Sequence, residues 1–479
     1  MQQLTGLDAA FLALESPGVY GHVGSVCILD PSTASEPLTL DRLSAVIEQR
    51  LHLVPPFRRR LAHVPLGLDQ PYWIEDPDFD IEYHVRELAL PAPGDDRQLS
   101  DQAARLHARP LDRSRPLWEL YFISGLSGGR VAIYSKVHHA AIDGVSGNDI
   151  LGALLDVTPE GREIETPPPW EPDGVPGPAM LLARSALALT GHPMRAARLT
   201  TDLVRRMPRL MGSPARPRLP LIDRVMRRGQ HDVLSQTGIR APRTPFNKPI
   251  TPHRRWAFRT IALPDVKTVK QASGMTVNDV VMALCAGALR RWLHDHDALP
   301  DSALVAAVPV SVRGTSEEGA GGNRVSTMLA PLPTHIADPA QRLAAVHEAM
   351  RGAKEQHGAL PADLLSDVTQ FAMPALAGQA ARLTARLRLL EWLNPFNLFI
   401  SNVPGPKVPL YYAGAKLVAY YPLSAISHGQ GLNITVMSYG DGMHFGLIAC
   451  RELVPDLEEL ADHLVTELQV LLELVPDIV

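Results

Sequence analysis

The chain has 479 residues, of which 46% are hydrophobic and 20% are charged. This length is enough for two or more domains with a sizeable core, and a formal net charge of −5 argues against a protein that binds nucleic acid. No uninterrupted apolar run approaches the roughly 18 residues that cross a bilayer, so any association with a membrane must be peripheral.

The first part of the chain mixes helix and strand patterns. Residues 43–51 carry apolar side chains at helical spacing, and residues 131–137 form an apolar run that predicts a buried strand. A helix-like run follows at residues 148–156. We therefore expect an N-terminal α/β domain over residues 1–165.

Two adjacent histidines stand at the end of the predicted strand. His138 and His139 are followed by Asp143 and Gly144. A polar cluster at the end of a buried strand costs desolvation energy and usually has a use. One imidazole can act as a general base near neutral pH, whereas the aspartate is better suited to holding the turn than to contacting a substrate.

This segment alone leaves three interpretations open. A histidine at a strand end is often a satisfied core residue, and histidine with aspartate is an ordinary set of zinc ligands. Adjacent residues on a strand point to opposite faces, however, so His138 and His139 would not readily bind one metal ion. Acid–base catalysis is therefore favoured over a structural role, and both are favoured over a metal site.

A proline-rich connector begins near residue 167, and we interpret residues 166–253 as a crossover linker that carries one or two helices. Its basic stretch, residues 180–211, interleaves Leu, Met and Ala with Arg. Such a helix can lie on an anionic membrane or lipid-droplet surface, or it can be an ordinary surface helix packed on its own protein. Residues 380–392 are a second candidate of this kind.

Regular patterns return in the last part of the chain and predict a C-terminal α/β domain over residues 254–479. Two α/β halves of similar size, joined by the connector, fit the whole pattern. The expected elements are a strand at 256–263, a helix at 278–293, a strand at 303–312 that ends at Arg313, a hairpin of strands 432–438 and 444–450, and a helix at 456–474.

The cysteine pattern and the N-terminal residues indicate in which cellular compartment the protein is expected. The three cysteines are far apart, lie in apolar surroundings and form no metal or disulfide pattern, which fits a reducing cytoplasm. These residues are Cys27, Cys285 and Cys450. The N-terminal residues lack the basic start and apolar core of a secretory signal, so we expect a cytoplasmic protein.

The motif from His138 to Gly144 resembles that of the CoA-dependent acyltransferase superfamily. Further segments, in order over nearly the whole chain, make it similar to the bacterial wax ester synthase/diacylglycerol acyltransferase family, of the type that forms triacylglycerol in actinobacteria. These segments are residues 4–12, 110–119, 274–281, 308–313, 322–325, 401–406 and 444–447.

The resemblance implies an α/β sandwich of two chloramphenicol-acetyltransferase-like domains with a channel between them. Acyl-CoA would enter as co-substrate from one face, and diacylglycerol or a long-chain alcohol from the other, with no cofactor. The implied location is peripheral, at the inner face of the plasma membrane or on lipid droplets. His139 would sit at the channel centre as general base.

The chemistry of such a site also follows from the residue types. A neutral His139 can take the proton of the attacking alcohol, which is typically worth about 10²–10⁴ in rate. The resemblance implies Asn278 as the donor to the oxyanion, because its segment matches the family's Asn-Asp motif, and the alternative is that it caps the helix that begins there. Protonated His139 can return its proton to the CoA thiolate. No acyl-enzyme is needed.

The resemblance also implies supporting residues. Asp143 would form an ion pair with Arg313 that fixes the turn, His138 would point away from the channel and support the loop, and Gly144 would let backbone pass close to the channel. No metal ligand is expected. Three segment residues are expected to line the channel or shape a turn near it: Ser401, Asn402 and Pro404.

Three other functions are alternatives to this one. The first is a polyketide-associated or condensation-type acyltransferase, which shares the histidine motif. The second is a non-catalytic lipid-surface protein with the same fold. The third is a metal hydrolase, which predicts bound zinc and loss of activity with a chelator.

Overall fold

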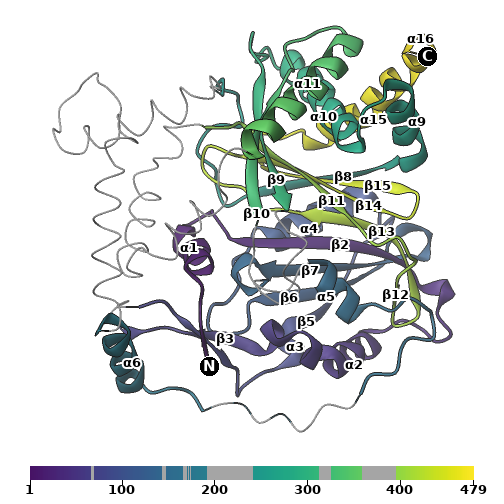
Figure 1. Ribbon diagram of the computed structural model, residues 1–479. Helices are drawn as coiled ribbons and strands as arrows, with labels where there is room; N and C mark the ends of the chain where they lie inside the picture. The colour runs from purple at the N-terminus through teal and green to yellow at the C-terminus, as the bar shows by residue number, and fades with distance from the viewer. Residues whose placement is uncertain are drawn as a thin grey trace.

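Two six-stranded sheets lie at the centre of the structure (Figure 1). This computed structural model describes residues 1–65, 69–142, 147–165, 170, 172, 174–190, 241–311, 325–358 and 395–478. A smaller sheet of three strands, in the order β1-β4-β3, stands beside the first large sheet. Its strands are β1 (Gln2–Gln3), β3 (Arg59–Ala62) and β4 (Tyr72–Glu75).

The first large sheet has the strand order β12-β13-β2-β7-β6-β5. Its strands are β2 (His22–Asp30), β5 (Val85–Ala89), β6 (Trp118–Ser124), β7 (Val131–His138), β12 (Tyr411–Tyr412) and β13 (Ala415–Leu423). The second sheet has the order β10-β9-β11-β14-β15-β8. Its strands are β8 (Arg254–Ala262), β9 (Leu304–Ser311), β10 (Val325–Leu332), β11 (Leu398–Pro404), β14 (Leu432–Tyr439) and β15 (Gly442–Cys450).

Two strands from late in the chain complete the first sheet. β13 pairs with β2 in antiparallel register, from Lys416 opposite Asp30 to Leu423 opposite Gly24. The first sheet therefore contains strands from two distant segments of the chain, residues 22–138 and 411–423. The division at residues 165 and 254 stays a prediction, and the exchange of β12 and β13 is a feature that the sequence pattern did not indicate.

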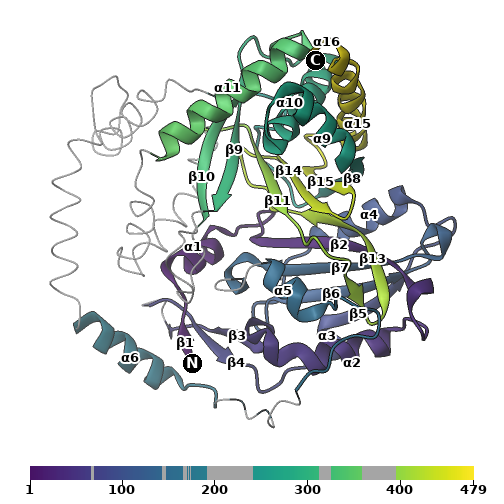
Figure 2. The same cartoon turned by 45° about the vertical axis from the view of Figure 1, so that its right-hand side comes forward.

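Helices cover the outer face of each large sheet (Figures 1 and 2). Apolar side chains of α2 and α5 pack with the first sheet, and those of α9, α10, α11 and α15 pack with the second. The described helices are α1 (Gly6–Leu14), α2 (Leu40–Arg50), α3 (Ile81–His84), α4 (Asp96–His107), α5 (Gly147–Leu154), α6 (Pro178–Thr190), α9 (Leu263–Ser273), α10 (Val277–Asp295), α11 (Pro339–Gly358), α15 (Leu457–Glu473) and α16 (Val475–Ile478).

A third apolar cluster joins the two halves. It combines Val26 and Tyr134 of the first sheet with Trp256 and Ile448 of the second, and α4 contributes Leu99. These side chains are almost fully buried, so separating the halves would expose a large apolar area to water. The two sheets are therefore held against each other by their own core.

Most elements expected from the sequence are confirmed, including the strand that carries the histidines, now β7, and the helix that carries Asn278, now α10. The expected hairpin is β14 and β15, whose registered pairs run from Leu432 opposite Ala449 to Tyr439 opposite Gly442. Its turn contains Gly440 at φ 55°, a conformation that favours glycine. The α/β class with two sheet-based halves is also confirmed.

The helices begin with local signals that the sequence carries. At α10, the Oγ1 of Thr276 accepts the backbone N–H of Asp279 at 3.2 Å, and the Asp279 carboxylate accepts the N–H of Thr276 at 3.0 Å. This capping box satisfies two backbone donors at the helix start. Asp95 and Gln98 form the same arrangement at α4.

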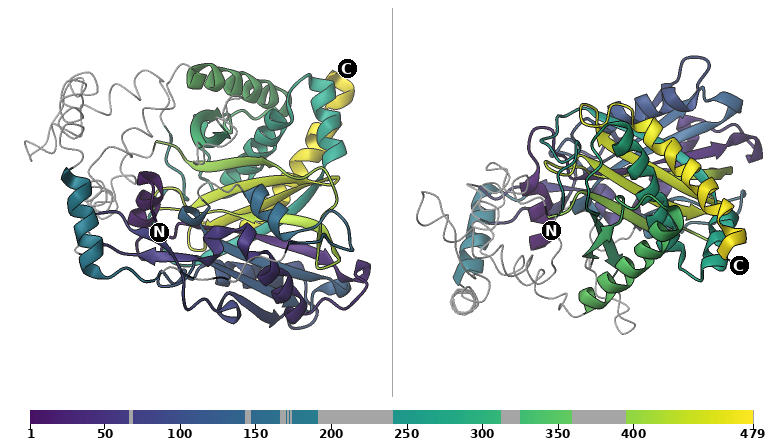
Figure 3. Two further views of the ribbon diagram at one scale, coloured as in Figure 1. Left: turned by 60° about the horizontal axis from the view of Figure 1, so that its bottom comes forward. Right: turned by 90° about the horizontal axis from the view of Figure 1, so that it is seen from above.

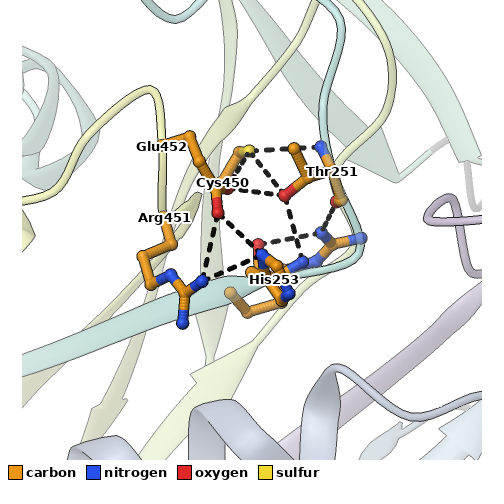
Figure 4. Close-up of polar contacts among 6 residues, drawn as sticks. Thr251, His253, Cys450, Arg451 and Glu452 are labelled. Carbon is orange, nitrogen blue, oxygen red and sulfur yellow. Dashed lines mark hydrogen bonds and ion pairs between the residues drawn. The ribbon is translucent and has the colours of Figure 1, made fainter.

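The segment entering β8 is fastened to the turn after β15 by a polar cluster (Figure 4). Glu452 accepts from Thr251 Oγ1 at 2.5 Å and contacts His253 Nδ1 at 2.7 Å. Arg254 in turn donates to the carbonyl of Gly18, in the loop between α1 and β2. The cluster therefore braces the loop that leads into the first sheet against the second half of the molecule.

Among the described helices, none is by itself both long and apolar enough to cross a bilayer, and α9 with α10 meets that criterion only as a pair bent by 103°. Of the basic stretch 180–211, only the part in α6 is described, and α6 lies at the margin of the molecule in both views of Figure 3. The second basic candidate, residues 380–392, lies outside the described residues.

Candidate functional site

His139 begins a short turn directly after β7. His138 is the last residue of the strand, and residues His139–Ala141 form a 3-10 turn, named η6. The backbone N–H of His139 donates to the carbonyl of Gly21 at 2.8 Å, which ties the turn to the loop before β2. The His139 side chain is half-buried, and its ring stacks on Phe11 of α1 with 4.3 Å between centroids and an interplanar angle of 23°.

The side chain of His138 is almost fully buried. Its Nδ1 accepts the backbone N–H of Ala140 at 3.1 Å, and its Nε2 lies 3.1 Å from the Glu15 carboxylate. Glu15 also accepts the N–H of Gly21 at 2.6 Å and pairs with Arg113. Burial raises the pKa of Glu15, but His138, the Gly21 N–H and Arg113 together lower it to about 2, so the carboxylate is ionised at neutral pH.

Asn278 is the second residue of α10 and is half-buried. Thr276 is the residue that caps the helix, so capping does not explain an asparagine at position 278. The Nδ2 of Asn402, on β11, donates to the Oδ1 of Asn278 at 3.4 Å. The structure therefore brings together two residues that the sequence analysis selected separately, and leaves the amide N–H groups of Asn278 to point elsewhere.

The neighbour of Asn278 is a buried carboxylate. Asp279 accepts from Thr276 at the helix start and contacts Nδ1 of His347, on α11, at 3.0 Å. Burial raises the pKa of Asp279, but these hydrogen bonds outweigh burial and lower it. The start of α10 is thus held in place from within the core, and with it the position of Asn278.

The remaining sequence candidates are placed as follows. Ser401 is half-buried on β11, where the parallel register sets it opposite Thr435 of β14, and Pro404 ends the strand at the surface. Asp143, Gly144 and Arg313 lie outside the described residues, and so does their expected ion pair. Within the described ranges no group of three or more His, Cys, Asp or Glu side chains could hold a metal ion.

Two family models match this chain. Residues 4–281 match the model of the wax ester synthase/diacylglycerol acyltransferase catalytic domain, and residues 321–472 match that of the C-terminal domain of the same family. The chain belongs to the wax ester synthase/diacylglycerol acyltransferase family. The resemblance carried by the motifs is therefore confirmed.

Individual members of this family are similar over their whole length. A putative diacylglycerol O-acyltransferase of Mycobacterium tuberculosis is 38% identical over 477 residues, covering 99% of this chain and 90% of the relative. One of Mycobacterium bovis is 37% identical, covering 96% and 97%. The solved wax ester synthase/diacylglycerol acyltransferase of Marinobacter aquaeolei superposes with a TM-score of 0.69 at 32% identity, covering 99% of both chains.

A more distant likeness concerns the fold alone. The first condensation domain of the calcium-dependent antibiotic synthetase superposes with a TM-score of 0.53 at 16% identity, covering 99% of this chain and 96% of that one. The two-halved architecture is thus shared with a protein of much lower sequence identity.

Several residues around the histidines of this family member were missed by the sequence analysis. Phe11 lies in a segment that the resemblance included, yet its stack on His139 had no local signal. Glu15 and Arg113 carry no pattern that points to His138, because their partners are distant along the chain. Gly21 is needed for space, since a Cβ there would lie 2.8 Å from Nε2 of His138.

Proposed function

We propose that this protein transfers a long-chain acyl group from acyl-CoA to the hydroxyl of diacylglycerol, forming triacylglycerol, and that long-chain alcohols are alternative acceptors that yield wax esters. Membership of the family and the names of the relatives support this activity. The observation that carries the proposal is the placement of His139, half-buried at the end of a central strand and held by both its backbone and its ring.

His139 acts as the general base in this proposal. As the acceptor hydroxyl attacks the thioester carbonyl, its proton passes to the imidazole, and the new C–O bond forms. The tetrahedral intermediate then expels the CoA thiolate, which takes the proton from the imidazolium. Proton and leaving group balance without an acyl-enzyme, and the products are an ester and free CoA.

Asn278 stabilises the oxyanion of the intermediate. Because its Oδ1 accepts from Asn402, its amide N–H groups are available as donors. A preorganised donor of this kind typically contributes about 3–4 kcal/mol to the transition state. The capping box and the contact of Asp279 with His347 support the role, since both keep the start of α10 from shifting.

The supporting roles of the remaining sequence candidates belong to the same proposal. His138 supports the loop, Asp143 and Arg313 form the ion pair that fixes the turn, and Gly144 gives the backbone room at the channel. Ser401, Asn402 and Pro404 line the channel or shape a turn near it; the contact of Asn402 with Asn278 supports this for one of the three.

The test is release of CoA thiol from palmitoyl-CoA by the purified protein, with diolein or hexadecanol as acceptor. Wild type should release CoA only when an acceptor is present, and His139→Ala should lose about 10²–10⁴ in kcat while keeping its far-ultraviolet circular dichroism. His294→Ala removes an exposed histidine of α10 and should behave as wild type.

Two results would overturn the proposal. If wild type releases no CoA with either acceptor, a condensation-type acyltransferase or a non-catalytic lipid-surface protein accounts better for the fold. If folded His139→Ala keeps the wild-type rate, the base is another group. The acceptor with the higher kcat/KM names the principal activity.

The same proposal includes peripheral binding to the inner face of the plasma membrane or to lipid droplets. Two large apolar side chains of α6, Met180 and Leu187, are 53% and 71% exposed, which supports contact with lipid. Flotation with vesicles that contain phosphatidylglycerol should lose most bound protein after Met180→Glu with Leu187→Glu. Val465→Glu, at an exposed position of α15, is the matched control.

A further inference from the structure

The carboxylate of Glu15 reaches the turn that carries His139 by two routes. One runs through the side chain of His138, whose other ring nitrogen accepts from the N–H of Ala140 inside the turn. The other runs through Gly21, whose N–H donates to Glu15 at 2.6 Å and whose carbonyl accepts the N–H of His139 at 2.8 Å. Both routes end on backbone groups of η6, at consecutive residues.

The first route sets the tautomer of His138. A backbone N–H can only donate, so Nδ1 of His138 must carry a lone pair toward Ala140. In the neutral ring the proton then resides on Nε2, and Nε2 faces the ionised carboxylate of Glu15, which only accepts. The other tautomer would place a lone pair against the carboxylate and a proton against the Ala140 N–H, losing both hydrogen bonds.

The surroundings favour these contacts over rearrangement. The His138 side chain is 2% exposed and that of Glu15 is 16% exposed, so water competes weakly for either group. Gly21 leaves room for the ring, because a Cβ would lie 2.8 Å from Nε2 of His138. Arg113 anchors the carboxylate from the other side and donates to the carbonyl of Leu12 at 2.8 Å.

Residues of α1 and the position after it therefore contact both the ring of His139 and the turn that carries its backbone. Phe11 in α1 stacks on the ring, and Glu15, the residue that follows α1, holds the turn beneath it. Figures 1 and 2 show α1 beside the edge where the two halves meet. A shift of α1 would move the ring and the turn together, which keeps the orientation of the imidazole unchanged relative to its own backbone.

We propose that Glu15 is a positioning residue of the transfer reaction, which acts through His138 and Gly21 to fix the turn from which His139 works. This inference rests on the proposed function of His139. Glu15 acts by selecting the His138 tautomer and by orienting the Gly21 peptide.

The kinetic test compares Glu15→Ala and Glu15→Gln with wild type in the palmitoyl-CoA assay. Glutamine keeps an oxygen that can accept from both Gly21 and His138, whereas alanine removes every contact. Glu15→Ala should lower kcat about 10- to 100-fold with KM for palmitoyl-CoA nearly unchanged, since displacements of about 1 Å at a reacting group cost on this order. Glu15→Gln should have a kcat within about threefold of the wild-type value, because it keeps the accepting oxygen. Asp30→Asn, at an exposed turn carboxylate, is the control for loss of a negative charge.

A double-mutant cycle tests the route through His138. If Glu15 acts through that ring, the double variant Glu15→Ala with His138→Ala should lose little more than the more impaired single variant. Losses in kcat that multiply fully, or a Glu15→Ala variant with wild-type kcat, would overturn the proposal. Equal losses in the alanine and glutamine variants would also overturn it, because they would assign the effect to charge alone.

A spectroscopic measurement on wild type keeps the inference testable if Glu15→Ala does not fold. The ¹⁵N shifts of His138, assigned by comparison with His138→Asn, should report a proton on Nε2 and a lone pair on Nδ1. The opposite tautomer overturns the proposal. This readout does not depend on turnover, so it separates a failure of the positioning role from a failure of the acyltransferase activity, which wild type tests by itself.

Discussion

Asn402 on β11 directs its side-chain amide at the amide oxygen of Asn278 on α10, across 3.4 Å. The two residues are 124 positions apart in the chain; Asn278 lies at the start of α10, and Asn402 lies within β11, which pairs with β14. This pair orients the proposed oxyanion donor, because accepting from Asn402 leaves only the N–H groups of Asn278 to face a substrate.

We expect Asn278→Ala to lower kcat about 100-fold, since the lost donor acts on charge that develops in the transition state. Asn402→Ala should lower kcat less, by about tenfold or under, because the donor remains and only its orientation is released. Single-turnover CoA release would measure both. Thr276→Ser keeps the helix cap and is expected to match wild type; equal losses for Asn278 and Asn402 would contradict the assigned roles.

The stack of Phe11 on His139 should contribute to catalysis by orienting the imidazole. An aromatic pair of this kind contributes about 0.5–1.5 kcal/mol, so Phe11→Ala should lower kcat roughly 3- to 10-fold. Phe79 stacks on His84 with 5.3 Å between centroids, and Phe79→Ala is a matched control that removes the same kind of ring contact. A control that loses as much kcat as Phe11→Ala would show that the loss reflects general destabilisation.

Acid should weaken the fold through Glu15. Its pKa is lowered from 4.5 to about 2 in the folded chain, so its contribution to stability is complete above pH 4.5 and is lost as the pH falls toward 2. Between pH 6 and pH 3 this amounts to about 2 kcal/mol. The side chain of the Glu15→Gln variant cannot titrate, so the variant keeps its stability where wild type loses it. The difference in free energy of unfolding between wild type and Glu15→Gln, measured by urea unfolding, should therefore be smaller at pH 3 than at pH 6 by that amount. A difference that stays constant would contradict the lowered pKa.

The buried carboxylate of Glu467, in the second half, leaves room only for glycine at position 287. Glu467 of α15 pairs with Arg342 of α11 and lies 3.5 Å from Arg291 of α10. A Cβ at Gly287 would lie 2.0 Å from the carboxyl carbon of Glu467, so Gly287→Ala must displace the charge from its partners. We expect a loss of about 3 kcal/mol or more in the free energy of unfolding.

Gly352 provides the matched control for that substitution. It also lies within a helix, α11, but a Cβ there would meet no atom within 4 Å. Gly352→Ala should therefore leave stability unchanged or raise it by up to about 1 kcal/mol. Equal melting temperatures for the two alanine variants would show that the Glu467 cluster rearranges without cost.

The sequence predicted the elements that depend on local spacing. The apolar run before His138 became β7, and the helix predicted to begin at Asn278 is α10, which starts one residue earlier because Thr276 and Asp279 form the cap. Apolar periodicity and capping residues involve only a few neighbouring positions, so both can be recognised in the sequence. The ordered motifs predicted the family for the same reason, since they are read along the chain.

By itself the sequence determined the α/β elements, the family and the histidine motif of this protein. Only the tertiary structure decided that β13 completes the first sheet, that Glu15 meets His138 over a separation of 123 residues, and that Asn402 meets Asn278. The physical reason is that these contacts join segments far apart in the chain: Glu15 and His138 within the first half, Asn278 and Asn402 within the second, and β13 with β2 from opposite parts of the sequence. Such contacts form only when the chain folds, and burial in the core, not any local pattern, selects which polar groups become partners.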